Sequence, residues 1–258
     1  MIKWCAYCQR FMQEVEPYDD FSITHGLCHA CVSEHPDPFA IDVVEHAHKL
    51  RKTFSALFDA GRREDFAAAT RIVDEAIAAN CRPVDLLVGM ISPMLYEIGD
   101  EWKRGVLSFE DECRFTAFSE KVVELVESRI GPKPAAPIAA NAALLFLMNA
   151  PGNRHDLGVH ILSVWLEGQG ANVQIIDGDA DLDAFMDRIA AERPKCILIS
   201  MALSDQRDHV AAIAQGVQAL PRDVRPRVIV GGYPVKAGLI QAIAGAELLR
   251  DAGALRTL

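Results

Sequence analysis

The sequence has little positive charge and no long apolar run. Its 258 residues include 36 Asp and Glu against 26 Lys and Arg, which gives a formal net charge of −10. This charge repels nucleic acid, and short basic pairs such as Arg62 and Arg63 do not offset it, so we expect no direct binding to nucleic acid. No apolar run approaches the roughly 20 residues of a membrane span, so we expect no membrane insertion.

The N-terminus, from Met1 to Cys5, lacks the apolar region of a secretory signal peptide. The chain nevertheless has seven cysteines, a combination typical of a reducing compartment. We therefore expect a cytoplasmic protein. The sequence also shows no acid–base pair and no nucleophile arrangement, so we expect no independent enzymatic activity.

Three compositional blocks divide the chain. Residues 1–36 are rich in cysteine, histidine and aromatic residues, and residues 37–130 carry apolar residues at three- and four-residue spacings. Short connections predict that the second block is a four-helix bundle. Pro83 suits a first helical turn, and Ser108 with Asp111 suits an N-cap and its N3 acid. The expected helices are Ile41–Ala60, Arg63–Ala79, Pro83–Trp102 and Ser108–Ile130.

A Pro- and Ala-rich linker, residues 131–140, leads into a third block, residues 141–258. Strands and helices alternate there, which predicts an α/β domain with a five-stranded parallel sheet of the flavodoxin or Rossmann type, covered on both faces. The expected strands are Ala142–Met148, Asn172–Ile176, Cys196–Met201, Arg227–Val230 and a short one near Glu247–Leu249. The expected helices are Val159–Glu167, Leu182–Ala191, Gln206–Leu220 and Val235–Ala244.

Unusual residues follow three of these strands. The first strand leads into the loop 153–158, which contains His155, the third strand ends in a hydroxyl at Ser200, and the fourth is followed by Gly231 and Gly232. Open parallel sheets bind ligands at the carboxyl ends of their strands. Glycines there let a ligand approach the backbone closely. An imidazole at this edge can coordinate a metal carried by a large planar cofactor.

The three loops together resemble the cobalamin-binding domain, with its Asp-x-His-x-x-Gly, Ser-x-Leu and Gly-Gly motifs in order. The resemblance implies that His155 is the lower ligand of cobalt, that Ser200 contacts the nucleotide tail, and that the two glycines admit this tail. The alternative is an ordinary loop histidine in a flavodoxin-like regulatory domain. The implied cofactor-binding residues are Asn153, Arg154, His155, Asp156, Gly158, Ser200, Ala202, Leu203, Gly231 and Gly232.

The sequence departs from the family pattern at two positions. Asn153 stands where the family has Asp, which accepts a hydrogen bond from the ligating imidazole and raises its basicity. Since Asn is uncharged, we expect His155 to be a weaker ligand without proton-linked switching. The second departure is a one-residue displacement of the family's Leu to Leu203.

The helical block resembles the cap above the corrin ring in methionine synthase, corrinoid methyl carriers and cobalamin photoreceptor regulators. In adenosylcobalamin light sensors, a Glu-His pair follows a Trp by ten and eleven residues. Trp102 and Glu112 match that spacing, but Cys113 stands in the His position and Lys103 replaces a second His found in some sensors. The resemblance places Trp102, Glu112 and Cys113 near the upper face of the cofactor. It leaves open aquo- or methylcobalamin, or a haem or bilin. The alternatives are helix packing for Trp102 and a structural thiol for Cys113.

Four cysteines form two C-x2-C pairs that are separated by 19 residues. Thiolates in such pairs suit tetrahedral Zn²⁺, and a metal would stabilise a segment of 36 residues that has too little core to fold alone. A redox dithiol pair or free thiols are the alternatives. The segment also resembles a small cysteine module appended to bacterial sensor kinases and response regulators, which favours signalling. The predicted zinc ligands are Cys5, Cys8, Cys28 and Cys31.

These features lead to three hypotheses of function. The first is a light- or ligand-responsive cobalamin-binding regulator that acts through a protein partner, such as a DNA-binding regulator or another signalling protein. The second is a corrinoid methyl carrier of a methyltransferase system. The third is a haem- or bilin-binding sensor on the same scaffold. The negative charge of the chain favours action through a protein rather than on DNA directly.

Overall fold

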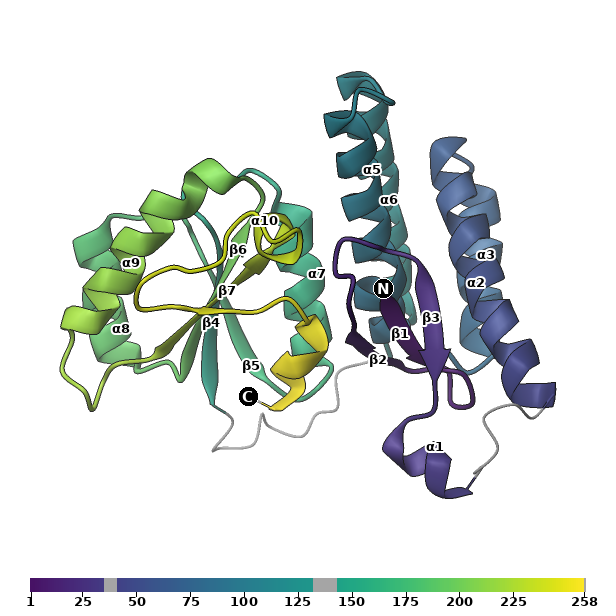
Figure 1. Cartoon of the computed structure of the whole chain (residues 1–258), viewed down its shortest axis with the longest axis horizontal. Coiled ribbons are helices and arrows are strands. Elements are labelled where there is room, and N and C mark those ends of the chain that lie inside the picture. The colour runs from purple at the N-terminus through teal and green to yellow at the C-terminus, as the bar shows by residue number, and fades with distance from the viewer. Residues whose placement is uncertain (35–40, 132–142, 258) are drawn as a thin grey trace. The chain divides into compact units, whose positions relative to one another are not determined.

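The computed structural model describes residues 1–34, 41–131 and 143–257. The chain forms two compact units, Met1–Lys133 and Pro134–Leu258 (Figure 1). The predicted linker, residues 131–140, lies outside the described residues except for Gly131. Within the described ranges, no helix is long and apolar enough to cross a membrane.

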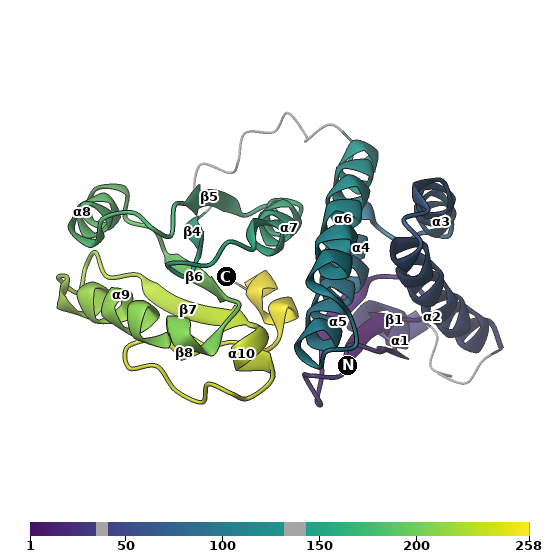
Figure 2. The same ribbon diagram turned by 90° about the horizontal axis from the view of Figure 1, so that it is seen from above.

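The first unit contains the predicted four-helix bundle (Figure 2). Its first, second and fourth helices are α2 (Ile41–Arg62), α3 (Phe66–Ala78) and α6 (Phe109–Arg129). The third runs through α4 (Pro83–Leu86), a π-helical turn (Leu87–Ile91) and α5 (Ser92–Lys103). Buried aromatic rings from α2 and α6 form part of the core, namely Phe54, Phe58, Phe115 and Phe118.

Two predicted helix starts in this bundle are confirmed in detail. Pro83 is in the first turn of α4, where its missing N–H costs no helical hydrogen bond. The Ser108 side chain accepts from the Asp111 backbone N–H, and the Asp111 carboxylate accepts from the Ser108 N–H, which makes the expected capping box.

The third helix contains a π-helical turn that the sequence pattern did not predict. Pro93 has no N–H to donate to the carbonyl of Gly89, four residues earlier, and its ring disfavours regular helix there. The Ser92 N–H instead bonds to the Leu87 carbonyl, five residues back. The helix widens locally, and the Gly89 carbonyl becomes available to a partner outside the helix.

The N-terminal segment forms a small sheet that packs on this bundle. Strands β1 (Ile2–Cys5), β2 (Phe11–Glu14) and β3 (Ile23–Gly26) have the order β2-β1-β3, and α1 (His29–Glu34) follows. β1 is antiparallel to β2 and parallel to β3. The Phe21 ring stacks on the Tyr96 ring of α5 at 5.3 Å between centroids. The segment therefore shares its core with the helices and does not depend on its own few apolar residues alone.

The second unit is the predicted five-stranded parallel sheet. Its strands are β4 (Leu144–Asn149), β5 (Asn172–Ile176), β6 (Cys196–Met201), β7 (Arg227–Gly232) and β8 (Glu247–Leu248), in the order β5-β4-β6-β7-β8. All four neighbouring pairs are parallel. This is the doubly wound order of flavodoxin-like proteins.

Helices cover both faces of this sheet. α8 (Leu182–Glu192) and α9 (Arg207–Ala219) lie on one side, and α7 (Asp156–Glu167) and the C-terminal 3-10 turn (Ala252–Thr257) lie on the other (Figure 1). A short 3-10 turn, Ser204–Gln206, precedes α9. Burial on both faces explains why the strands are nearly continuous apolar runs rather than alternating ones.

One predicted helix is wrong. The segment Val235–Ala244 contains only the end of α10 (Tyr233–Lys236) and then irregular chain. Gly238 has a φ of +69°, which ends the helix in the left-handed conformation that glycine favours. Ile240 and Ile243 are buried against the sheet from this irregular segment, so burial here does not require a helix.

Candidate functional site

The pairing of the strands brings the three predicted loops together at one edge of the sheet. Asn149, the last residue of β4, lies opposite Ser200 of β6, and Ser200 lies opposite Gly231 of β7. Met201 is paired with Gly232 in the same ladder. The loop that carries His155 leaves β4 directly after Asn149. The carboxyl ends of three adjacent strands therefore present the histidine, the hydroxyl and the glycine pair to one region.

His155 occupies the N-cap position of α7, and its side chain is exposed. The predicted helix began at Val159, whereas α7 begins at Asp156. The histidine is thus the last residue before a helix of 12 residues, so the rigid helix limits its freedom. An exposed imidazole at this position is available to a metal outside the chain.

The side chain of Asn153 is buried and holds the loop in place. Its Nδ2 donates to Asn149 Oδ1 at 2.9 Å and to the Ser200 carbonyl at 3.1 Å, and its Oδ1 accepts from the His155 backbone N–H at 3.0 Å. Asn149 Nδ2 in turn donates to Asp156 Oδ1 at 2.7 Å. This amide network fixes the backbone of His155 from β4 and β6. The Asn153 oxygen is directed to the backbone N–H of His155 rather than to its ring.

Two acidic residues near this loop have structural roles. Asp156 opens α7 and accepts the bond from Asn149. Asp179, which follows β5, accepts from the Gly152 N–H at 2.7 Å and lies 3.7 Å from the exposed guanidinium of Arg154. The roles of Asn149 and Asp179 were not predicted from the sequence. A polar residue that closes the apolar run of β4 was the available signal for Asn149.

The glycines at this edge have different roles. A Cβ on Gly158 would meet no atom within 4 Å, so the space beside this helical residue is open. Gly232 has a φ of +103°, and a Cβ there would lie 2.0 Å from the Met201 carbonyl oxygen. A Cβ on Gly231 would lie 3.3 Å from the Leu249 carbonyl oxygen. The fold itself therefore requires Gly232, whereas Gly158 leaves space that a ligand can use.

The loop after β6 offers a hydroxyl and an apolar side chain. Ser200 is half-exposed, and no group in the described part of the chain hydrogen-bonds to its hydroxyl. The backbone N–H groups of Ala202 and Leu203 both donate to Gln206 Oε1, at 2.9 and 3.1 Å, so Gln206, which the sequence reasoning missed, orders this loop. The Leu203 side chain is exposed. A hydroxyl without a partner, at the same edge of the sheet as the open space at Gly158, fits a polar ligand group.

The predicted cap residues lie in the first unit, at the turn between α5 and α6. Trp102 is 41% exposed, and its ring lies 6.4 Å from that of Phe109. Phe109 and Val106 are exposed as well, so Trp102 belongs to an apolar surface group and not to the interior of the bundle. Packing between helices is therefore not a sufficient explanation for an exposed tryptophan at position 102. Apolar groups gathered on a surface are typical of a binding face.

Glu112 and Cys113 follow in the first turns of α6. Glu112 is half-buried and accepts a hydrogen bond from the Thr116 hydroxyl at 3.2 Å. Cys113 is exposed, so a buried structural thiol is excluded. Desolvation first, and then the charges of Glu112 and Glu110, raise the pKa of the Cys113 thiol. Cys113 is therefore not an activated thiolate.

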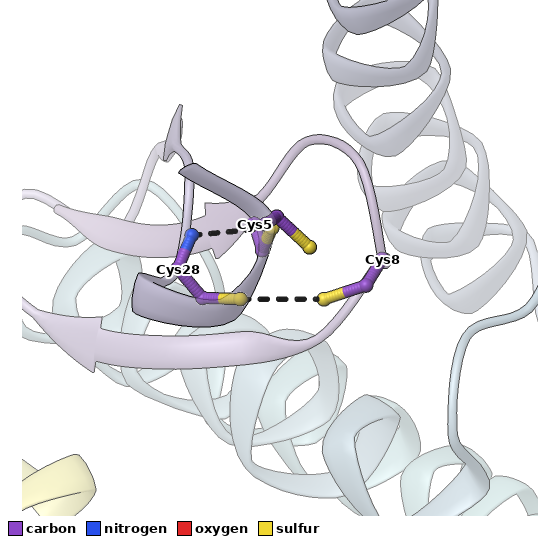
Figure 3. Close-up of side chains that lie close together, drawn as sticks. Cys5, Cys8 and Cys28 are labelled. Atoms are coloured by element: carbon purple, nitrogen blue, oxygen red, sulfur yellow. Dashed lines mark hydrogen bonds between the residues drawn. The ribbon is translucent and has the colours of Figure 1, made fainter. Parts of the chain in front are cut away.

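The four N-terminal cysteines also come together. Their sulfur atoms all lie within 4.8 Å of one another, and none is in a disulfide. The Sγ atoms of Cys8 and Cys28 are 3.8 Å apart, and the Cys28 N–H donates to Cys5 Sγ at 3.4 Å (Figure 3). The predicted grouping of these cysteines is thus present in the fold.

Comparisons with known proteins match both units. A B12 binding domain family model matches residues 144–244, and a second B12 binding domain model matches residues 54–127. Trimethylamine corrinoid protein 2 of Methanosarcina mazei is 19% identical over 171 residues, which cover 66% of this chain and 78% of that protein. An uncharacterized 20.5 kDa protein from the bchF-crtJ intergenic region of Rhodobacter capsulatus is 26% identical over 185 residues, which cover 70% of this chain and 92% of that protein.

The fold is also that of a solved structure. The Methanosarcina barkeri monomethylamine corrinoid protein matches with a TM-score of 0.64 and 17% identity, over 80% of this chain and 96% of that one. The family models and the curated relatives that name a cofactor name B12 or a corrinoid, and they give no support to haem or a bilin. The open space at Gly158, the exposed imidazole and the free hydroxyl fit such a ligand. Both units of the chain thus match B12 binding domain families, which supports cobalamin binding.

Proposed function

We propose that this chain binds cobalamin with His155 as the lower ligand of cobalt, and that it carries a methyl group on this cofactor for a partner methyltransferase. The observation that carries the binding site is the ladder in which Asn149, Ser200 and Gly231 lie side by side, with His155 on the adjoining loop. The carrier role is supported by similar proteins that are named trimethylamine corrinoid protein and monomethylamine corrinoid protein.

The residues of the chain have distinct tasks in this proposal. The imidazole of His155 donates a nitrogen lone pair, and Asn153 holds its backbone through the bond to the His155 N–H. Ser200 offers its hydroxyl to the tail of the ligand, and Gly158 leaves space beside α7. Cobalamin, when bound, supplies a cobalt ion that accepts and gives up a methyl group. The transfer itself belongs to the partner, so the chain is a carrier and not an enzyme on its own.

The test of the binding site is a measurement of cobalamin affinity and absorption in the full chain. His155→Ala should weaken binding by about tenfold or more and change the absorption spectrum, since it removes the lower ligand. His209→Ala, on the exposed start of α9, is the matched control and should behave like wild type. Unchanged affinity and spectrum in His155→Ala would contradict the axial-ligand proposal.

A second measurement identifies the ligand atom directly. Cobalt(II) bound to one axial ¹⁴N shows three-line nitrogen splitting in electron paramagnetic resonance, and ¹⁵N gives two lines. In chain grown with ¹⁵N-histidine and loaded with unlabelled cobalamin, we expect the two-line pattern. A three-line pattern would mean that the cofactor's own nitrogen, and not His155, binds cobalt.

One observation favours a second function, a cobalamin-dependent sensor that acts through a DNA-binding regulator or another signalling protein. Asn153 is uncharged, and its amide is committed to Asn149, Ser200 and the His155 backbone. A carrier that exchanges methyl groups gains from a titratable partner behind its histidine, and this chain has none at that position. Such a chain is better suited to hold one form of cobalamin and to respond when light or exchange of the upper ligand alters that form.

The two functions make opposite predictions for the loaded chain. A carrier whose cobalt has first been reduced to cobalt(I) by an added chemical reductant accepts a methyl cation from a methylated amine when a cognate methyltransferase is added. The demethylated amine leaves, and the absorption changes to that of methylcobalamin in darkness. A sensor keeps its cofactor form under those conditions but changes its spectrum on illumination or on exchange of the upper ligand. Zinc at the N-terminal cysteines is a separate proposal, because none of these cysteines lies in the unit that carries His155.

A further inference from the structure

Trp4, the residue before the first cysteine of the cluster, is inserted into the π-helical turn of the third helix. The ring is fully buried, and its Nε1–H donates to the Gly89 carbonyl at 3.2 Å. This is the carbonyl that Pro93 cannot bond, since proline lacks an N–H. A Cβ on Gly89 would lie 2.3 Å from the Trp4 ring, so only glycine fits. The tryptophan of β1 thus completes the hydrogen bonding of the helix.

The four cysteines next to this contact have the geometry of one tetrahedral metal site. A Zn–S bond of about 2.3 Å requires sulfur atoms about 3.8 Å apart at tetrahedral corners. The distance between Sγ of Cys8 and Sγ of Cys28 is 3.8 Å, and all four sulfurs lie within 4.8 Å of one another. The same spacing is far too long for a disulfide, whose S–S bond is about 2.05 Å. The cluster therefore matches a bound ion better than a pair of oxidised thiols.

The local backbone supports thiolates at this site. Cys5 ends β1, and Cys28 directly precedes α1, which contains Cys31 in its first turn. The Cys28 N–H points at Cys5 Sγ, a contact that stabilises a metal-bound sulfur from behind (Figure 3). The pairing of Cys5 with Gly26 and the bond from the Ala6 N–H to the Gly26 carbonyl hold the two cysteine pairs together.

We infer that Cys5, Cys8, Cys28 and Cys31 hold one Zn²⁺ ion, and that this ion fixes the N-terminal sheet so that Trp4 stays seated in the π-helical turn of the third helix. Two of the ligands are buried and the strands of the segment have only four residues each, so the ion adds to the small core that the segment shares with the helices. The inference concerns the first unit only and goes beyond the proposed function.

The first test is the metal content of the full chain after purification without added chelator. We expect about one zinc per chain and little iron, measured by mass spectrometry of the elements. Cys8→Ser and Cys28→Ser, at the two half-exposed ligands, should lower the zinc content by about tenfold or more. Cys113→Ser, an exposed cysteine outside the cluster, should retain the wild-type content. Iron in place of zinc, or no metal with two disulfides, would overturn the inference.

A variant that fails to fold would also lose zinc, so wild-type chain provides an independent measurement. Cobalt(II) added to metal-free chain should give the intense absorption bands of a tetrahedral tetrathiolate site, and zinc should abolish them. Absence of these bands in a chain that keeps its helical circular dichroism would count against the site. Cobalamin is omitted from this experiment, so failure of the zinc site and failure of the cobalamin site are distinguishable.

The link to the third helix is tested by hydrogen exchange in the full chain, with and without zinc. Removal of zinc should raise the exchange rate in residues 1–34 and in Leu87–Ile91 by about tenfold or more, because Trp4 then leaves the turn. Exchange in the sheet unit, residues 144–232, should not change. Equal exchange in Leu87–Ile91 with and without zinc would refute the coupling, even if the metal binds.

Discussion

At the scale of single residues, Asn153 is the position at which this loop differs from the Asp-x-His-x-x-Gly motif of the cobalamin-binding domain that it resembles. The amide donates to two oxygen acceptors, Asn149 Oδ1 and the Ser200 carbonyl. A carboxylate at this position would face both oxygens without a proton to offer. Asn149 cannot turn its amide to compensate without losing its own bond to Asp156.

We therefore expect Asn153→Asp to destabilise the cobalamin-free chain by about 1–3 kcal/mol at pH 7, as measured by urea unfolding. The loss should shrink as pH falls, because a protonated carboxyl can donate one of the missing bonds. Asn172→Asp, half-exposed at the start of β5, is the matched control and should have little effect. If Asn153→Asp were as stable as wild type, the amide network would not be holding the loop.

Gly158 allows folding and ligand binding to be separated. It lies inside α7, and a Cβ would meet no atom within 4 Å, so Gly158→Ala should stabilise the chain by up to about 1 kcal/mol through helix propensity. If cobalamin fills this space, the same methyl group should weaken its binding by about tenfold. Urea unfolding and a cobalamin titration measure the two effects. Unaltered affinity in the stabilised variant would place the ligand elsewhere.

At the scale of elements, the third helix contains two glycines with opposite surroundings, one tightly packed and one open. Gly89 contacts the Trp4 ring, so Gly89→Ala should destabilise the first unit by about 3 kcal/mol through overpacking. Gly99 lies in the same helix with no atom within 4 Å of its Cβ position. Gly99→Ala is therefore the control, with a gain of up to about 1 kcal/mol. Thermal unfolding of both variants measures the difference. Equal unfolding midpoints would contradict the close packing of the Trp4 ring against Gly89.

The start of α6 has a pH-dependent cap. Hydrogen bonds from the Ser108 side chain and backbone, and the charge of Arg114, hold the pKa of Asp111 below its usual range despite some desolvation. A lowered pKa in the folded state stabilises the helix above the unfolded pKa of about 3.9, and this contribution is lost as pH falls through the folded value.

Ser108→Ala removes the cap, so we expect a lower unfolding midpoint at neutral pH. Part of the difference from wild type should disappear as pH falls through the folded-state pKa of Asp111, which is lower than its usual value. Thermal melts from pH 2 to 7 provide the measurement. A difference of constant size across this range would show that Asp111 does not take part.

At the scale of the whole molecule, the chain has two compact units with one proposed ligand each. The proposed zinc ligands lie in the first unit, and the proposed lower ligand of cobalt lies in the second. Ligands that bind only the folded state raise its stability, by about 2.7 kcal/mol at one hundred times the dissociation constant. Calorimetry of the full chain should therefore show that zinc removal lowers the transition of the first unit, and that cobalamin raises that of the second.

The matched variants assign these transitions. His155→Ala should reduce the shift caused by cobalamin and leave the shift caused by zinc unchanged, whereas Cys28→Ser should do the reverse. A single transition that responds to both ligands and is lost equally in both variants would mean that the two units unfold as one.

The sequence by itself determined the elements of the sheet unit and the order of its loops. Three strands, Asn172–Ile176, Cys196–Met201 and the body of Arg227–Gly232, were predicted within two residues, because strands buried on both faces are continuous apolar runs. His155, Ser200 and the glycine pair were likewise visible as polar or small residues that interrupt such runs. The capping box of α6 followed from Ser108 and Asp111 alone.

Only the tertiary structure decided which groups these residues contact. The role of Asn153 depends on Asn149 and Ser200, which strand pairing brings to it from distant positions in the chain. The π-helical turn is stabilised by Trp4, 85 residues away, and Gly238 ends α10 within the helix that was predicted over Val235–Ala244. Local patterns report burial and conformational preference, whereas hydrogen-bond partners across the fold are set by packing, which no short stretch of sequence contains.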